Sequence, residues 1–279
     1  MKAAYGQNFL TNRDVAERII GYLAPGPEDA VVEIGPGKGI LTEMIAGRVK
    51  NFTVIEIDPV YHNLVRNKVK NIDSVNQDAL KFDYAGLRSR LGSPLKLVSN
   101  LPYEISSPIM NVFVSQKSAF SELVLMFQKE FGDRLCAREG DSSRGALSVI
   151  AGINFYIQRL FNAPREDFNP VPKVDSTVLR LIPRQDSEMN EDLRWASGSK
   201  FFDYFVHQVF KLRRKKLKNS IHGMFMGIPP DVKEKIFVSE AGVDLNKRPQ
   251  ELKTDELIIA GKKYDEYLSS RENVKDGDE

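Results

Sequence analysis

The chain has 279 residues, of which 42% are apolar and 28% are charged, as in an ordinary globular protein. This composition excludes a disordered, collagen-like or coiled-coil chain. The 40 basic and 38 acidic residues nearly balance, so the distribution of charge rather than its sum must indicate any anionic partner.

Short apolar runs alternate with helical patterns over the first two-thirds of the chain. Strands are predicted at Ala30–Ile34, Phe52–Ile57, Ser74–Asn76, Leu95–Ser99 and Glu122–Phe127. Helices are predicted at Ile40–Arg48, after Asp58-Pro59, and from Ser107-Pro108 onward. This alternation predicts an α/β fold with a Rossmann-like, mostly parallel sheet and helices on both faces. Tyr156–Phe161 and Thr177–Leu181 have little helix between them, so we expect the sheet to end in an antiparallel pair.

The pattern changes after Pro183, where residues 184–192 are polar. Helices are then predicted at Phe201–Leu217, Pro230–Glu240 and Thr254–Ser270, with no strand signal. We therefore expect two domains. An α/β catalytic domain would span residues 1–184, and a smaller all-α domain would span residues 185–279.

A glycine turn, Glu33-Ile-Gly-Pro-Gly-Lys-Gly39, follows the first predicted strand of the sheet. Gly35 and Gly37 let the backbone turn sharply and approach a ligand closely. The Gly-x-Gly-x-Gly spacing differs from the Gly-x-Gly-x-x-Gly turn of dinucleotide enzymes and suits a ligand without a pyrophosphate, such as S-adenosylmethionine. A tight turn with no ligand is the alternative.

Two carboxylates follow the next strands of the predicted sheet. Glu56 lies at the end of the second strand, where it can accept hydrogen bonds from both ribose hydroxyls. Asp78 follows the third strand, where it can meet the adenine amino group. Because the ends of parallel strands meet at one edge, the turn and both carboxylates are expected in a single crevice.

Asn100-Leu101-Pro102-Tyr103 follows the fourth strand and is expected in the same crevice. An exocyclic adenine amine is a weak nucleophile, because its lone pair is delocalised into the ring. The Asn100 side-chain oxygen and the Leu101 carbonyl can hold its two N–H groups and aim the lone pair at a methyl donor, while Tyr103 stacks on the base. A structural proline turn is the alternative.

The chain resembles the ribosomal-RNA adenine dimethyltransferase family over nearly its whole length. The resemblance rests on several segments in order: Gly6–Leu10, Glu33–Gly39, Val54–Asp58, Gln77–Ala79, Asn100–Tyr103 with Ile105–Pro108, Gln128–Glu130 and Phe168–Ser176. It implies that the substrate is small-subunit rRNA, in which two adjacent adenosines near the 3′ end become N6,N6-dimethyladenosine. It also implies a monomer that acts on a pre-30S-type or equivalent small ribosomal subunit.

The resemblance assigns roles to particular residues. Those implied to contact S-adenosylmethionine or line its pocket are Asn8, Leu10, Gly35, Glu56, Asp78 and Asn100. Asn100 and Tyr103 would hold the target adenine, and Phe168 would stack on its other side. Glu104 departs from the pattern, because many bacterial members have Asn there.

A basic segment, residues 211–218, lies within the predicted helix Phe201–Leu217 and just beyond it. Its six basic residues are Lys211, Arg213, Arg214, Lys215, Lys216 and Lys218, and residues 204–230 include no acidic residue. A cluster of like charges is self-repelling, so we expect it to bind RNA phosphates. A solvated helix face is the alternative.

Other features concern metals and location. The single cysteine, Cys136, excludes an internal disulfide or zinc cluster, and the three histidines match no ligand spacing, so we expect no metal. The N-terminus lacks a signal-peptide core, and no apolar run approaches the ~18 residues of a membrane span. We expect a soluble cytoplasmic protein.

Four alternatives to a small-subunit enzyme remain open from the sequence. A large-subunit adenine methyltransferase of the macrolide-resistance type more often has Ile in place of Leu101. A non-catalytic RNA-binding assembly factor would not need the intact Asn100–Tyr103 turn. A nicotinamide oxidoreductase would need a different glycine turn. A DNA adenine methyltransferase is compatible with the catalytic turn alone.

Overall fold

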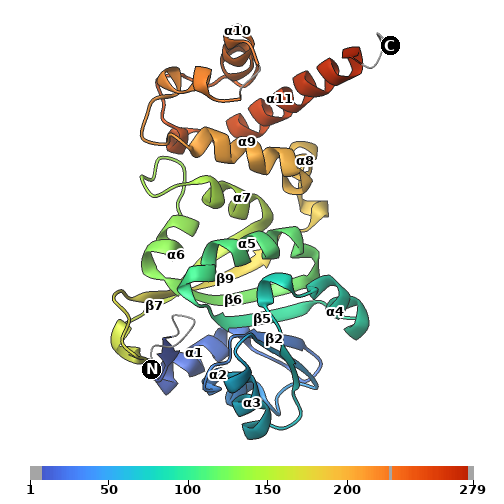
Figure 1. Ribbon diagram of the computed structural model, residues 1–279, viewed down its shortest axis with the longest axis vertical. Helices are drawn as coiled ribbons and strands as arrows, with labels where there is room; N and C mark the ends of the chain where they lie inside the picture. The colour runs from blue at the N-terminus through green and yellow to red at the C-terminus, as the bar shows by residue number, and fades with distance from the viewer. Residues whose placement is uncertain (1–7, 226–227, 276–279) are drawn as a thin grey trace. The chain divides into compact units, whose positions relative to one another are not determined.

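The computed structural model describes residues 8–225 and 228–275, and these form two compact units (Figure 1). The first unit contains the described residues up to Asp133 together with Phe155–Pro183. The second unit contains Arg134–Asn154 and the described residues from Arg184 onward. The break after Pro183 lies next to the expected boundary, but Arg134–Asn154 groups with the helical unit, whereas the sequence pattern placed it in the first domain.

A seven-stranded sheet forms the centre of the first unit (Figure 1). Its strands are β2 (Ala30–Ile34), β3 (Asn51–Glu56), β4 (Asp73–Asn76), β5 (Leu95–Asn100), β6 (Phe120–Gln128), β7 (Phe155–Ala163) and β9 (Ser176–Pro183), in the order β4-β3-β2-β5-β6-β9-β7. The first five strands in this order are parallel, while β9 is antiparallel to both β6 and β7. The predicted parallel sheet with an antiparallel end is confirmed.

Helices pack on the sheet because its strands are apolar on both faces. They are α1 (Arg13–Leu23), α2 (Ile40–Ile45), α3 (Pro59–Lys68), α4 (Tyr84–Leu91), α5 (Ser106–Ser115) and α6 (Lys129–Leu135). On one face, buried residues of α1 such as Ile19 and Ile20 pack with alternate strand residues such as Val31 and Val98. Asp58 caps α3 by accepting a hydrogen bond from the Val60 N–H at 2.8 Å, as its position before Pro59 predicts.

A second, two-stranded sheet joins distant parts of the first unit. Strand β1 (Phe9–Leu10) pairs antiparallel with β8 (Phe168–Asn169), and Leu10 lies opposite Phe168. The Thr11 N–H donates to the Asp167 carbonyl at 2.8 Å, which extends this pairing. The sequence pattern predicted neither strand.

The second unit is helical throughout its described residues. Its helices are α7 (Ala146–Asn154), α8 (Glu191–Gly198), α9 (Lys200–Phe210), α10 (Pro230–Glu234), continued by a π-helical segment at Lys235–Glu240, and α11 (Thr254–Lys275). Aromatic rings fill its core, where Phe205 stacks on Phe225 at 5.2 Å and contacts Tyr264 at 5.5 Å. None of the helices described, long α11 included, is apolar enough over sufficient length to cross a membrane.

Arg144 explains why Arg134–Asn154 belongs to the second unit. This side chain is only 3% exposed, and it donates hydrogen bonds to the carbonyls of Gln250 and Leu252 and to the Thr254 hydroxyl. A buried guanidinium needs such partners, so these bonds fasten the loop before α7 to the start of α11. A polar network of this kind leaves no local sequence pattern.

The helix predicted at Phe201–Leu217 is wrong in its second half. Helix α9 ends at Phe210, and the basic segment continues in turns and a short 3₁₀ helix at Leu217–Asn219. Like charges four positions apart, such as those of Lys211 and Lys215, disfavour a helix. The Leu217 and Lys218 N–H groups instead donate to the Lys247 and Leu245 carbonyls, each at 2.9 Å.

Gly132 gives a test of how helix α6 packs on the sheet. A Cβ atom at this position would overlap the Cγ2 methyl of Thr177, which is fully buried on β9. We expect Gly132→Ala to lower the free energy of unfolding by about 1–3 kcal/mol. Thr177→Ser removes the methyl but keeps the hydroxyl that donates to the Phe161 carbonyl. The double variant should regain most of the loss in denaturant titrations, and additive losses would contradict this packing.

Candidate active site

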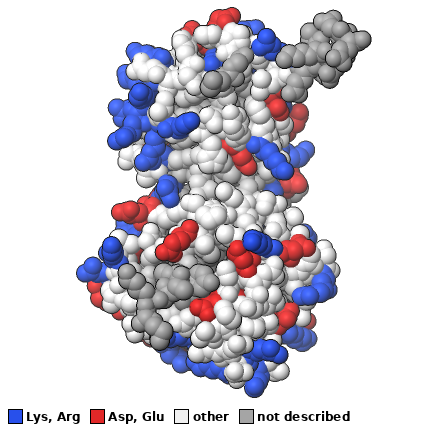
Figure 2. Space-filling model, viewed as in Figure 1, with Lys and Arg blue, Asp and Glu red and all other residues white. Residues whose placement is uncertain are grey.

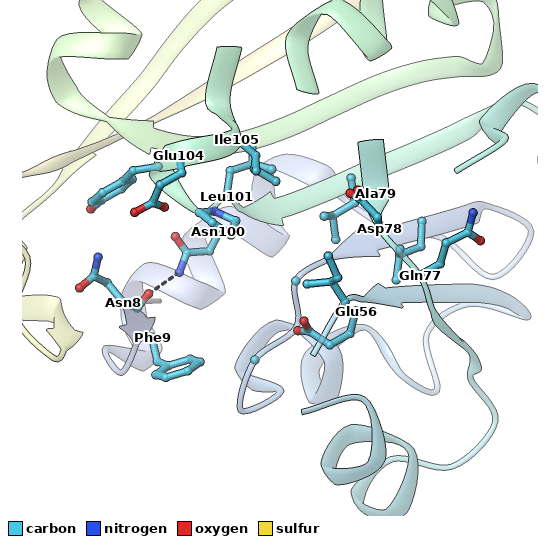
Figure 3. Close-up of a pocket in the computed structure, with 17 residues that line it drawn as sticks. Asn8, Phe9, Glu56, Gln77, Asp78, Ala79, Asn100, Leu101, Glu104 and Ile105 are labelled. Carbon is cyan, nitrogen blue, oxygen red and sulfur yellow. Dashed lines mark hydrogen bonds between the residues drawn. The ribbon is translucent and has the colours of Figure 1, made fainter. Parts of the chain in front are cut away.

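A cavity of about 320 Å³ lies at the carboxyl ends of the parallel strands of the first unit (Figure 3). Segments following β2, β3, β4 and β5 contribute to its wall, together with the N-terminal strand β1. Its lining residues are Asn8, Phe9, Ile34, Gly35, Gly37, Ile55, Glu56, Ile57, Gln77, Asp78, Ala79, Asn100, Leu101, Pro102, Tyr103, Glu104 and Ile105. This is the position where open parallel sheets bind their ligands.

The glycine turn after β2 is packed tightly by an aromatic ring. Gly35 and Gly37 both have positive φ, at 64° and 53°, which favours glycine. A Cβ on Gly37 would lie 2.7 Å from two ring carbons of Phe9, so only glycine allows this approach. The Gly35 N–H donates to the Ile55 carbonyl at 2.9 Å, which holds the turn against β3. The turn is therefore rigid and exposes backbone to the cavity.

Glu56 presents a buried acceptor without a partner. Its side chain is 2% exposed, and Oε1 accepts a hydrogen bond from the Asp58 N–H at 2.9 Å. Oε2 is buried and has no hydrogen-bond partner among the described residues. Burial raises the pKa of Glu56, although the backbone N–H groups of Asp58 and Gly37 oppose this shift. A buried acceptor of this kind requires a donor, such as the hydroxyls of a ligand.

Asp78 is fixed by a capping bond. One of its oxygens accepts from the Leu80 N–H at 2.9 Å at the start of the 3₁₀ helix Ala79–Lys81. Its neighbours Gln77 and Ala79 also line the cavity. The local turn thus holds one carboxylate oxygen of Asp78 and leaves the other for a ligand.

Asn100 is oriented by Asn8, the residue directly before β1. Its Nδ2 donates to the Asn8 carbonyl at 3.0 Å (Figure 3). Because the amide nitrogen is committed to Asn8, the side-chain oxygen is the group that remains to accept a hydrogen bond from a ligand. The Leu101 N–H donates to the Met126 carbonyl at 3.2 Å, which fixes the backbone of the turn beside β6.

Tyr103 is anchored through its hydroxyl. The Tyr103 Oη and the Ser176 Oγ lie 3.1 Å apart and share a hydrogen bond. Ser176 is fully buried at the start of β9. Burial raises the pKa of Tyr103, and the Asp175 and Glu104 carboxylates act in the same direction. The ring is therefore held by its tip as a wall of the cavity.

The structure brings most of the predicted residues together. Those that line the cavity are Asn8, Gly35, Gly37, Glu56, Asp78, Asn100, Leu101, Pro102 and Tyr103. Leu10 and Phe168 do not line it, because the β1–β8 pairing directs both into the core, where they are 5% and 2% exposed. The structure thus gives Phe168 no surface on which to stack a base.

Local sequence patterns do not predict every residue of the cavity. Phe9 approaches Gly37 through the long-range β1–β8 pairing, which local spacing does not show. Ile57 and Ile105 also line the cavity with apolar surface, which their positions in the sequence do not indicate. In the part of the chain that the structure describes, no group of three or more His, Cys, Asp or Glu residues is arranged to hold a metal ion.

The basic segment lies in the second unit. All six of its Lys and Arg residues are exposed. Figure 2 shows Lys and Arg side chains gathered at its upper left, over the loops that follow α9 in Figure 1. The Arg213 guanidinium donates to the Ser143 carbonyl at 3.5 Å, so this segment is tied to the loop before α7.

The sheet, the glycine turn and the acidic strand ends define a Rossmann-like methyltransferase. The family model described as ribosomal RNA adenine dimethylase matches residues 1–257. The chain therefore belongs to this family of rRNA-modifying enzymes and is a methyltransferase.

Individual relatives and structures agree with this family. "Ribosomal RNA small subunit methyltransferase A" from Pediococcus pentosaceus is 38% identical over 266 residues, covering 92% of this chain and 87% of the relative. The protein of the same name from Geobacter metallireducens is 37% identical, covering 92% of each chain. A dimethyladenosine transferase from Plasmodium falciparum has a TM-score of 0.71 at 25% identity, covering 90% of this chain and 95% of that one. The 23S rRNA methyltransferase ErmE has a TM-score of 0.66 at 26% identity, covering 92% and 100%.

Glu33, directly before the glycine turn, makes the stability of the first unit depend on pH. Its side chain lies on β2 and is 2% exposed, and this burial raises its pKa from 4.5 to about 8. The Thr42 hydroxyl lowers the pKa by a smaller amount, and the negative charge of Glu56 raises it. The folded protein holds this proton more tightly than the unfolded chain. The contribution of Glu33 is therefore present in full below pH 4.5 and is lost as the pH rises to about 8.

We expect Glu33→Gln to remove this pH dependence, because glutamine does not ionise. The free energy of unfolding of the unmodified protein should fall between pH 5 and pH 9. This fall should be about 2–4 kcal/mol larger than the fall in the variant. Denaturant titrations at both pH values measure this difference. Glu17→Gln, at an exposed position on α1, is the control and should leave the pH profile unchanged. Parallel profiles for Glu33→Gln and the unmodified protein would contradict the assignment.

Proposed function

We propose that the chain transfers methyl groups from S-adenosylmethionine to N6 of two adjacent adenosines near the 3′ end of small-subunit rRNA, forming N6,N6-dimethyladenosine. The observation that carries this proposal is the Asn100–Asn8 hydrogen bond, which commits the amide nitrogen and leaves the oxygen for an amine donor. The relatives at 37–38% identity are named as small-subunit rRNA methyltransferases, which supports this substrate.

The residues at the strand ends fit S-adenosylmethionine. The unpartnered Oε2 of Glu56 suits the ribose hydroxyls, and the second oxygen of Asp78 suits the adenine amino group. Gly35 and Gly37 give the methionine part close access to the backbone, while Asn8, directly before β1, lines another part of the cavity. The bound group supplies an electrophilic methyl on a sulfonium, so the protein need not provide the reactive atom.

The remaining wall residues hold the target base. The Asn100 oxygen and the Leu101 carbonyl each accept a hydrogen bond from one N–H group of the adenine amine. These two bonds aim the lone pair of the amine into the cavity. Tyr103, fixed by Ser176, supplies a flat apolar surface on which the base stacks. No strong base is needed, because an alkylated ammonium loses its proton readily. The residues of the cavity therefore act mainly by positioning the adenine amine and the methyl donor.

The basic segment is the RNA-binding surface in this proposal. Its six exposed cations suit phosphates, whose contacts position an RNA without reading its bases. Specificity then comes from the shape of the rRNA and from the adenine cavity. In this proposal the enzyme works as a monomer in the cytoplasm on a pre-30S-type or equivalent small subunit.

A large-subunit rRNA is the second candidate substrate, because the structure resembles that of the 23S rRNA methyltransferase ErmE. Incubation with labelled S-adenosylmethionine and with under-methylated small or large subunits separates the two. We expect dimethyladenosine in the small-subunit rRNA only. Label confined to the large subunit would overturn the choice of substrate, and label in neither would overturn the proposed function.

In the same assay we expect Asn100→Ala to lower the rate of methyl transfer by about 100-fold or more, because the target amine loses an acceptor and its alignment. Affinity for rRNA should change less than about threefold. The Asn100 side chain contacts only the target base, and its substitution does not alter the cations that bind phosphates. Thermal unfolding checks that the variant folds. Equal losses of rate and affinity would show that the turn has a structural role.

The basic segment predicts a specific salt dependence. Replacing Arg214 and Lys215 with Gln should reduce the slope of log affinity against log salt by about 0.7–0.9 for each phosphate that the segment no longer neutralises. Arg66→Gln with Lys70→Gln removes the same charge from exposed sites on and after α3 and serves as the control. Filter-binding titrations from low to high salt give the slopes. The same slope for both variants would remove the segment from the interface.

A further inference from the structure

The charged residues that line the cavity are all acidic. They are Glu56, Asp78 and Glu104, and no Lys or Arg is among the described lining residues. Glu56 and Asp78 each accept a backbone hydrogen bond that fixes the carboxylate in place. Glu104 is exposed and also lines the cavity. Within the described parts of the chain, its carboxylate forms no hydrogen bond and no ion pair. Its carboxylate therefore has no structural task that the described residues reveal.

Glu104 lies beside the residues that hold the target base. It occupies the centre of the 3₁₀ helix Tyr103–Ile105, directly after the catalytic turn. Figure 3 shows its carboxylate directed toward the side of the cavity where Asn100 and Asn8 lie. Its negative charge also acts on the Tyr103 hydroxyl, in the same direction as that of Asp175. Glu104 and Asp175 therefore both place negative charge near Tyr103, at the end of the cavity that holds the base in the proposed function.

Positive charge moves through this end of the cavity during the proposed reaction. A sulfonium methyl donor is cationic, whereas adenine is neutral, and the amine nitrogen becomes cationic as it gains the methyl group. A carboxylate on the adenine side favours this displacement of charge toward the base. An uncharged side chain at this position would not favour this displacement.

We propose that Glu104 is a charge-selecting residue, which makes the base end of the cavity prefer a cationic over a neutral group at the point of methyl transfer. The inference rests on the proposed function, because it uses the same cavity. Glu104 is exposed and screened by water and salt, so its effect is modest.

Two cofactor analogues test this preference without catalysis. Sinefungin carries an ammonium where the donor has its sulfonium methyl, and S-adenosylhomocysteine is neutral at that point. Isothermal titration of both ligands gives a ratio of affinities. We expect Glu104→Gln to reduce the preference for sinefungin about 3- to 10-fold, and added salt to reduce it in the unmodified protein. Glu17→Gln removes one exposed carboxylate outside the cavity and should leave the ratio unchanged.

The outcomes separate the two proposals. If neither analogue binds the unmodified protein, the proposed cofactor site is wrong. If both bind and Glu104→Gln keeps the same ratio, only the role of Glu104 is overturned. A single-turnover assay adds a second readout, in which Glu104→Gln should slow transfer about 3- to 10-fold without weakening rRNA binding. A loss of rRNA affinity with an unchanged single-turnover rate would also contradict the proposal.

Discussion

The active-site cavity depends on one constraint, which is that β4, β3, β2 and β5 run parallel and end at the same edge of the sheet. Each strand delivers one chemical group there, and short bonds between strands set the distances. The Ser99 hydroxyl donates to the Ile34 carbonyl at 2.7 Å between β5 and β2. The Gly35 N–H donates to the Ile55 carbonyl between β2 and β3. Small changes in strand register would therefore separate the glycine turn from Glu56 and Asn100.

The near-neutral charge of the whole chain conceals opposite local charges. Among the described residues that line the cavity in the first unit, the charged ones are all carboxylates, while the basic segment of the second unit exposes six cations. These two environments suit different ligands, because a methyl donor is cationic and an RNA backbone is anionic. An acidic cavity does not attract phosphates, so the proposed function assigns the affinity for RNA to the basic segment. In the proposed function, this separation of charge lets one protein hold both ligands.

Much of the cavity follows from the sequence because its groups lie at strand ends, where local spacing predicts position. The glycine turn, Glu56, Asp78 and Asn100 are of this kind. The basic segment was predicted as helix because apolar periodicity continues to Leu217, but the charges and the bonds to Leu245 and Lys247 favour turns. The grouping of Arg134–Asn154 with the helical unit depends on the buried bonds of Arg144, which no local pattern encodes.

The segment Phe168–Ser176 shows how a sequence motif can support a site without lining its cavity. At one end, Phe168 pairs with Leu10 beside Asn8 and Phe9, the residues that orient Asn100 and pack on Gly37. At the other end, Ser176 holds the Tyr103 hydroxyl. The Asn12 side chain also donates to Asp167 at 2.7 Å, which fastens the N-terminal strand to the start of this segment. In this structure the segment therefore supports the cavity wall at two places, so a change within it should alter the positions of Asn100 and Tyr103.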